Sequence, residues 1–240
     1  MIKQEQIDYL RVALQKDSNI FGSNIIFSDT VQSTQDALIK IADSASDGTI
    51  WLTRSQLSGR GRHGRVWLSP PGSLTFSVLI RPGIPAHKAG TLMMTSAVSL
   101  YSVLCRYTSA VSIKWPNDIM IDGKVAGIVI DTAISDVIQW AVIGVGVNVS
   151  IETKDMPGID TVSNHTTDAS AYEILLEFLK ELNRHHMNQY RDIQRIYKEE
   201  CSTIGNMVHY GDIQGLAIDI DKDGALLVQM EDNIKRVIIS

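Results

Sequence analysis

Hydrophobic residues recur along this chain with two spacings, one typical of helices and one typical of strands. Helical spacing of apolar positions predicts an N-terminal helix marked by Ile7, Leu10 and Leu14. A Ser-x-x-Asp start signal at residues 33–36, followed by further apolar residues, predicts a second helix. Longer helical patterns predict two more helices, over residues 87–107 and 168–200.

Runs rich in β-branched and apolar residues predict strands between these helices. They lie at residues 24–27, 49–53, 74–80, 111–115, 125–131 and 137–147. The last run is nearly continuous in apolar residues, so we expect it at the centre of a sheet. Because strands occur in pairs and helices in clusters, the order predicts an α+β fold, with a mixed, partly antiparallel sheet and flanking helices.

The pattern changes near residue 204, where short strands alternate with glycines. They are predicted at residues 207–210, 215–218, 225–228 and 237–239. A segment of under about 40 residues buries too little surface to be stable alone. We therefore expect a main domain over residues 1–203 and a small barrel-like β module over residues 204–240 docked on it.

Composition narrows the functional classes. The 240 residues include 22 Lys+Arg and 27 Asp+Glu, a net charge of −5, which argues against a general nucleic-acid binder. Cys105 and Cys201 lie far apart and outside any Cys/His cluster, so neither a disulfide scaffold nor a structural zinc site is expected. The charged N-terminus is unlike a signal peptide, and the longest apolar run, 140–147, is too short to span a bilayer. We expect a cytoplasmic protein without membrane contact.

Residues 59–67, Gly-Arg-Gly-Arg-His-Gly-Arg-Val-Trp, are the strongest chemical signal. Their glycines match the dinucleotide-binding pattern G-x-G-x-x-G, but a Ser-Pro-Pro-Gly stretch and a strand follow instead of the required helix. Arginine forks bind phosphate and carboxylate groups, and glycines let a backbone approach a ligand closely. The segment therefore predicts an anion-binding loop within a long loop over residues 56–73, in preference to a merely solvated basic loop.

Three weaker motifs follow in order. Residues 114–118 read Lys-Trp-Pro-Asn-Asp, residues 123–127 Gly-Lys-Val-Ala-Gly, and residues 144–148 Gly-Val-Gly-Val-Asn. Taken singly, each has a structural interpretation: an Asx-capped turn, a solvent-facing hairpin lysine and a strand-terminating asparagine. Two glycines within a strand also indicate close approach by a ligand or another backbone.

Taken together and in this order, the four motifs resemble the signature set of the biotin protein ligases. Ser33-Thr34 and Gln56 match further family positions, and the resemblance runs from about residue 25 to the C-terminus. Two positions depart from the family pattern: Gln35 replaces an asparagine, and Asp131 stands where glutamate is frequent. Because only about 24 residues precede the first strand, we expect the short form without a winged-helix DNA-binding domain.

The resemblance implies an enzyme that forms biotinyl-5′-AMP from biotin and ATP with Mg²⁺. It would then transfer biotin to a lysine of a biotin carboxyl carrier domain. Neither nucleic acid nor a membrane is expected as a partner. Whether the chain forms a homodimer is left open. It also implies an SH3-like barrel for the C-terminal module. The alternative is a lipoate–protein ligase, which shares fold and chemistry; the Gly-Arg-Gly-Arg string favours biotin. A non-enzymatic biotin sensor on DNA is opposed by the net charge.

The resemblance also assigns residues. An anionic carboxylate must attack an anionic phosphate, so cations must screen both groups. The catalytic candidates are Lys124, Arg60, Arg62 and Asp118. The biotin candidates are Ser33, Thr34, Gln56, Gly59, Arg60, Lys124 and Gly127. The ATP or adenylate candidates are Arg62, Arg65, Trp67, Asn117, Asp118 and Asn148. Asp118 is the candidate ligand for Mg²⁺.

Overall fold

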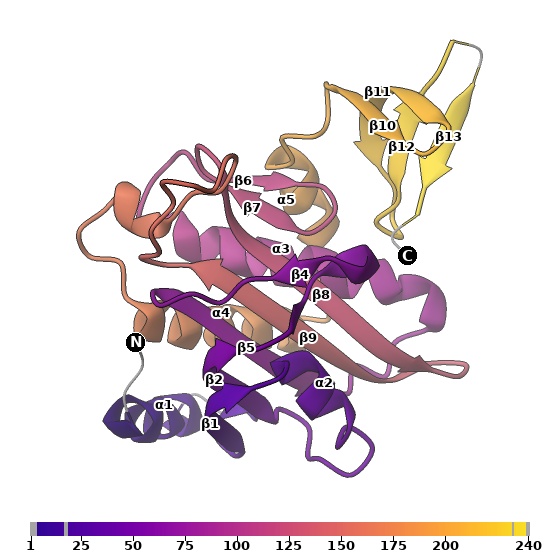
Figure 1. Ribbon diagram of the computed structural model, residues 1–240. Helices are drawn as coiled ribbons and strands as arrows, with labels where there is room; N and C mark the ends of the chain where they lie inside the picture. Colours follow the sequence, from indigo (N-terminus) through magenta and orange to yellow (C-terminus); the bar gives the residue numbers. More distant parts are fainter. Residues whose placement is uncertain (1–3, 17–18, 232, 239–240) are drawn as a thin grey trace.

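A computed structural model describes residues 4–16, 19–231 and 233–238, and its centre is a seven-stranded mixed sheet (Figure 1). The strand order is β1(Ile25–Val31), β2(Ile50–Gln56), β5(Ser73–Ile80), β9(Ile138–Asn148), β8(Lys124–Ile134), β7(Asp118–Met120) and β6(Ser112–Lys114). The pair β1–β2 is parallel and the other neighbours are antiparallel. The predicted mixed sheet is confirmed, and β9 occupies its middle as its continuous apolar run indicated.

Helices cover the two faces of this sheet unequally. On one face lie α3(Ala89–Leu104) and α4(Ala171–Met187), with α1(Gln4–Lys16) and α5(Ile193–Glu199) beside them (Figure 1). The other face carries the short α2(Thr34–Ile39) and the two-stranded hairpin of β3(Gly59–Arg60) and β4(Val66–Trp67). Single 3₁₀ turns are η1(Ile20–Gly22), η2(Arg62–Gly64), η3(Ala86–Lys88) and η4(Val162–Asn164). The thinly covered face is therefore the one where a ligand can reach the sheet.

Local sequence explains where the helices begin and where one prediction is wrong. Ser33 caps α2, because its Oγ accepts the backbone N–H of Asp36 at 3.2 Å. The single helix predicted over 168–200 is instead split into α4 and α5. In the link between α4 and α5 the backbone is left-handed at Gln189, Tyr190 and Asp192, with φ of 53°, 60° and 61°. Apolar periodicity runs through this link and so does not reveal the break.

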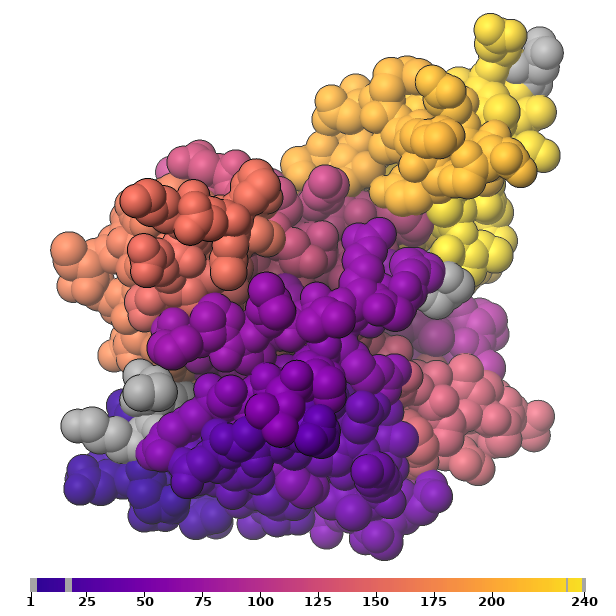
Figure 2. All heavy atoms as spheres, in the orientation of Figure 1, coloured from indigo at the N-terminus to yellow at the C-terminus, as the bar shows by residue number. Residues whose placement is uncertain are grey.

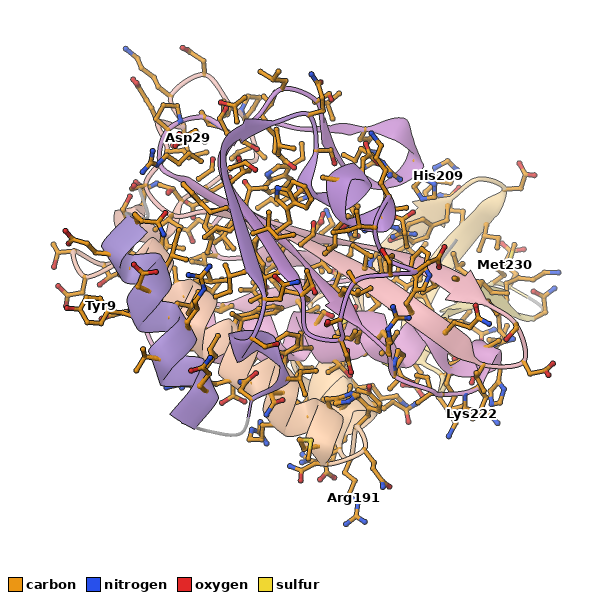
Figure 3. The ribbon with its side chains drawn as sticks, turned by 90° about the horizontal axis from the view of Figure 1, so that it is seen from below. Tyr9, Asp29, Arg191, His209, Lys222 and Met230 are labelled. Atoms are coloured by element: carbon orange, nitrogen blue, oxygen red, sulfur yellow. The ribbon has the colours of Figure 1, made fainter. Side chains whose placement is uncertain are left out.

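The core lies between the sheet and its helices. Phe76 of β5 packs edge-on against Phe178 of α4, with ring centroids 5.5 Å apart. By contrast Tyr9 projects outward from α1, and Arg191 lies at the edge of the molecule in the α4–α5 link (Figure 3). No helix among the described residues is long and apolar enough to cross a membrane.

The C-terminal segment forms a separate antiparallel sheet beside the main body (Figures 1 and 2). Its order is β10(Met207–Tyr210), β11(Ile213–Ile220), β12(Leu226–Gln229) and β13(Ile234–Val237). The strand predicted at 237–239 thus begins earlier, and Ile239 lies outside the described residues. Trp115 attaches this sheet to the main body: its Nε1 donates to the Gly224 carbonyl at 3.0 Å, and its ring meets Tyr210 edge-on.

Candidate active site

A cleft of about 680 Å³ opens on the thinly covered face of the sheet. It is bounded by α2, the β3–β4 hairpin, the β6–β7 turn, the start of β8 and the C-terminal sheet. Of the predicted site residues, eleven line it: Ser33, Thr34, Gln56, Arg60, Arg62, Arg65, Trp67, Asn117, Asp118, Lys124 and Gly127. Four motifs spread over about ninety positions therefore meet at one place.

The deep part of the cleft is a network of polar side chains that we call the polar floor: Thr34, Gln35, Gln56 and Ser77. The Thr34 backbone N–H donates to Oε1 of Gln56 at 2.8 Å, and the Thr34 hydroxyl lies 2.9 Å from that of Ser77. Ser77 donates to Oε1 of Gln35 at 3.0 Å. Thr34, Gln35 and Ser77 are at most 2% exposed, so the network is held rigidly by its own bonds.

Residues 59–67 form the second part of the cleft, the arginine loop. It is a hairpin in which Gly59 pairs with Trp67 and Arg60 with Val66. At its tip His63 and Gly64 both have left-handed φ, 54° and 72°. The predicted long loop thus contains two short paired strands.

The arginines of this loop are placed differently. Arg60 forms ion pairs with Asp36 and, at 3.4 Å, with Asp131; its hydrogen bond to Asp36 is the main cause of its raised pKa. Arg62 points inward, with Nη1 3.4 Å from Oδ1 of Asn117, and burial lowers its pKa. Arg62 is therefore the partly desolvated cation of the loop, suited to an anionic ligand.

Lys124 enters the cleft from the opposite side. Its Nζ lies 2.7 Å from Oδ1 of Asp118 and 5.4 Å from the centre of the Trp67 ring. Its backbone is fixed on both sides, since its N–H donates to the Gly158 carbonyl at 2.9 Å and its carbonyl accepts the N–H of Asp160 at 3.1 Å. The ammonium is thus held at the mouth of β8, as the sequence pattern predicted.

The glycines of β8 and β9 are explained by side chains that lie against them. A Cβ at Gly146 would come within 2.2 Å of the Trp67 ring, and one at Gly127 within 3.1 Å. A Cβ at Gly144 would lie 2.5 Å from Oε1 of Gln35. The sequence predicts close approach by a ligand or another backbone, but in the structure the protein's own side chains lie against these glycines. The buried Nε1 of Trp67 has no hydrogen-bond partner among the described residues.

Two predicted residues lie away from the cleft surface. Gly59 makes room for the hairpin, because a Cβ there would meet the Trp67 carbonyl at 2.4 Å. Asn148 is buried behind Lys124, and its Nδ2 donates to the carbonyls of Lys124 and Asp160, each at 3.2 Å. In the structure both residues support residues that line the cleft, and the direct ligand contacts expected of them stay predictions.

Sequence reasoning missed two groups of lining residues. Ser77 belongs to the polar floor, and its signal was a serine inside an apolar strand. Gln35, noted above only as a departure from the family pattern, lies beside it. The C-terminal sheet contributes Val208, His209, Tyr210 and Gly211 from its first strand and turn, and Val237 and Ile238 from its last. Burial raises the pKa of Tyr210. Figure 3 labels His209 on this sheet, which carries no motif of its own.

The sequence matches models of known families over most of these elements. Residues 27–148 match the biotin/lipoate A/B protein ligase family, and residues 208–240 match the biotin protein ligase C-terminal domain.

Among relatives, the bifunctional ligase/repressor BirA of Bacillus spizizenii is 29% identical over 92% of this chain and 74% of its own length. A biotin–[acetyl-CoA-carboxylase] ligase of Paracoccus denitrificans is 38% identical over 49% of this chain and 51% of its own.

A solved structure of the biotin protein ligase from Aquifex aeolicus, in complex with biotin and ATP, superposes with a TM-score of 0.76. It shares 26% identity and covers 90% of this chain and 95% of that chain. The chain therefore belongs to the biotin/lipoate A/B protein ligase family and carries the C-terminal domain of its biotin protein ligases.

Proposed function

We propose that this protein is an ATP-dependent biotin–protein ligase. It forms biotinyl-5′-AMP and pyrophosphate from biotin and ATP, and then transfers biotin to a lysine of a carrier domain of a biotin-dependent carboxylase. The observation that carries the proposal is one cleft in which a buried polar floor meets two cations from opposite sides, Arg62 and Lys124. That is the arrangement needed to join a small polar-headed carboxylate to a nucleotide phosphate.

We assign the polar floor to the biotin head. A ureido ring must find hydrogen-bond partners when it is buried. Thr34 and Gln56 of the floor, and Ser33 beside it, supply oxygens and an amide. Gly127 lies further along the same cleft, towards Lys124, where the acyl chain would pass. This places the biotin carboxylate between the floor and the cations.

Lys124 and Arg62 then act on the reacting groups. The carboxylate oxygen attacks the α-phosphorus of ATP and pyrophosphate leaves, so negative charge accumulates at the phosphate. Lys124 is held in place by its ion pair, and Arg62 is positioned once the ligands have ordered the arginine loop; cations held in a partly desolvated site then stabilise that charge. Asp118 holds Lys124 in place through their ion pair, and Arg60, tied to Asp36 and Asp131, anchors the base of the arginine loop.

Arg65, Trp67, Asn117 and Asp118 are assigned to the nucleotide side, with stacking of Trp67 on adenine as a prediction. A lone carboxylate combined with substrate phosphates is a common way to hold Mg²⁺, so Asp118 fits that ion. When bound, Mg²⁺ would screen the phosphate charges. Its recruitment would require Asp118 to share its carboxylate with Lys124.

The two chain segments take different parts in this proposal. The main domain, residues 1–203, supplies the floor and the cations, and the C-terminal module, residues 204–240, closes one side of the cleft. The second step needs access for a carrier lysine, and the cytoplasm is where carrier and ligase would meet.

The lipoate alternative fits this cleft less well. A lipoyl dithiolane ring has no N–H or carbonyl group, so the buried hydroxyls and amides of the floor would lose water without gaining a partner.

The proposal is tested by mass spectrometry of the protein mixed with Mg-ATP and biotin. Biotinyl-AMP, pyrophosphate and a labelled carrier lysine are expected. Preferential transfer of lipoate in a competition assay would overturn the substrate assignment, and no adenylate with either acid would overturn the activity.

A further inference from the structure

Asp131 lies outside the cleft, yet its carboxylate contacts a side chain that lines it. Nε2 of Gln35 donates to Oδ2 of Asp131 at 2.8 Å and to the carbonyl of Val142 at 2.9 Å. An ionised carboxylate and a backbone carbonyl can only accept, so this side of the Gln35 amide must be its NH₂ group. The orientation of the buried amide is thereby fixed.

That orientation decides the direction of the next hydrogen bonds. Oε1 of Gln35 faces Ser77 and accepts the Ser77 hydroxyl proton at 3.0 Å. A serine hydroxyl has one proton, so Ser77 must accept in its 2.9 Å contact with Thr34. The Thr34 proton is therefore held within the protein, by Ser77 or by Oε1 of Gln56 at 3.2 Å. What Thr34 Oγ1 can offer to the cleft is a lone pair.

We propose that Asp131, acting through Gln35 and Ser77, is a positioning residue that makes Thr34 a hydrogen-bond acceptor towards the ligand. This inference rests on the proposed function and adds a source of substrate selectivity to it. The ureido ring of biotin carries N–H donors that match an acceptor, whereas a ligand without N–H groups leaves the buried oxygen unpaired. The carboxylate thus selects for a donor-bearing ligand that it does not touch.

The surroundings keep this chain of bonds in one arrangement. Gly144 leaves the space that Oε1 of Gln35 occupies. Arg60 holds the other oxygen of the Asp131 carboxylate at 3.4 Å. Because Arg60 also pairs with Asp36, an effect transmitted through Arg60 can be separated from one transmitted through Gln35.

The experiment measures biotin affinity by calorimetry in Asp131→Asn, with Asp36→Asn as the matched control. Asparagine at 131 replaces one of the two acceptors that orient the Gln35 amide with a group that can also donate. Only the Val142 carbonyl then favours the native orientation, so the amide is held less strongly. We expect biotin to bind about tenfold more weakly to Asp131→Asn, the equivalent of one hydrogen bond, with an unchanged KM for ATP. Asp36→Asn removes a partner of Arg60 but none of Gln35, so it measures any effect that passes through Arg60, and its loss of biotin affinity should be smaller than that of Asp131→Asn. Wild-type affinity in Asp131→Asn, or equal loss in both variants, would overturn the inference.

A double-mutant cycle with Thr34→Val identifies the route. If Asp131 acts through the Thr34 oxygen, the double variant should bind biotin as weakly as Thr34→Val alone. If the fold-losses in biotin affinity of the two single variants multiply in the double variant, this route is contradicted. Should Asp131→Asn fail to fold, Ser77→Ala breaks the same chain of bonds and enters the same cycle, with the same two outcomes. A wild type that makes no biotinyl-AMP would refute the proposed function, whereas an active wild type with normal Asp131→Asn binding would refute only this inference.

Discussion

The polar floor and the arginine loop face the same cleft but differ in how far the protein itself fixes them. Thr34, Gln35 and Ser77 are buried and bonded to one another. The arginine loop is mostly exposed, and its tip runs through two successive left-handed residues, His63 and Gly64. Folding has already ordered the floor, so it can select a ligand without further change. Ordering the loop costs roughly 1–2 kcal/mol per residue, which ligand contacts would have to offset.

The largest effect we expect is a difference in hydrogen exchange between the arginine loop and the central strands. Without ligand, the amides of residues 58–67 should exchange at least about a thousandfold faster than those of β5 and β9, because local opening spans free energies from near zero to that of global unfolding. Biotin with Mg-ATP should protect the loop and leave the central strands unchanged. A loop as protected in the free protein as the central strands would contradict the comparison.

Lys124→Ala is expected to slow adenylate formation by about 10²–10³, the usual loss for one fixed group that stabilises transition-state charge. The side chain is 26% exposed, so the cost to folding should stay within about 1 kcal/mol. Single-turnover rates and chemical denaturation measure the two effects separately. The exposed Lys154, changed to alanine, is the control, and an unchanged rate in Lys124→Ala would remove the lysine from the mechanism.

Arg62→Gly should weaken the contacts of the arginine loop with biotinyl-AMP. Loss of charge-assisted hydrogen bonds is worth about 1.5–3 kcal/mol, so biotinyl-AMP should dissociate roughly 10–100 times faster. The released anhydride would then label nearby lysines without selection. Stopped-flow release from wild type and variant tests this, with His63→Gly as a control at the exposed tip. Equal release rates would show that the loop does not retain the adenylate.

Asp160→Asn probes the support behind Lys124 and should have the smallest effect. Burial alone would raise the pKa of Asp160, but hydrogen bonds from His165, the Thr161 N–H and Asn164 outweigh it and lower the pKa. The stabilisation is therefore complete above the unfolded pKa of about 3.9 and is lost as pH falls through the lower native value.

At pH 7 the free energy of unfolding of the variant should be about 1 kcal/mol lower than that of the wild type. Between pH 5 and pH 2 it should fall less than that of the wild type. Urea unfolding across that range is the measurement. Parallel pH profiles for both proteins would mean that the Asp160 carboxylate adds no stability.

Much of the fold could be predicted because its signals are local. The central position of β9 followed from its unbroken apolar run, and the start of α2 followed from the Ser33 cap. The break between α4 and α5 could not be predicted. Its left-handed residues are Gln189, Tyr190 and Asp192, and none is a glycine, the residue that usually indicates this conformation.

For the site, the sequence by itself determined which chemistry is present. Arginines spaced by glycines, the lysine at a strand mouth and the Lys-Trp-Pro-Asn-Asp string are local patterns, and their order carries the family resemblance. The tertiary structure alone decided what each side chain does. In the structure Arg60 pairs with two carboxylates, whereas Arg62 points into the cleft. The ring of Trp67 packs against Gly146. The structure also joins Asp131 to Thr34 through Gln35 and Ser77. The physical reason is that hydrogen bonds and ion pairs depend on distances of a few ångströms between residues up to a hundred positions apart, and the packing of the sheet and its helices sets those distances.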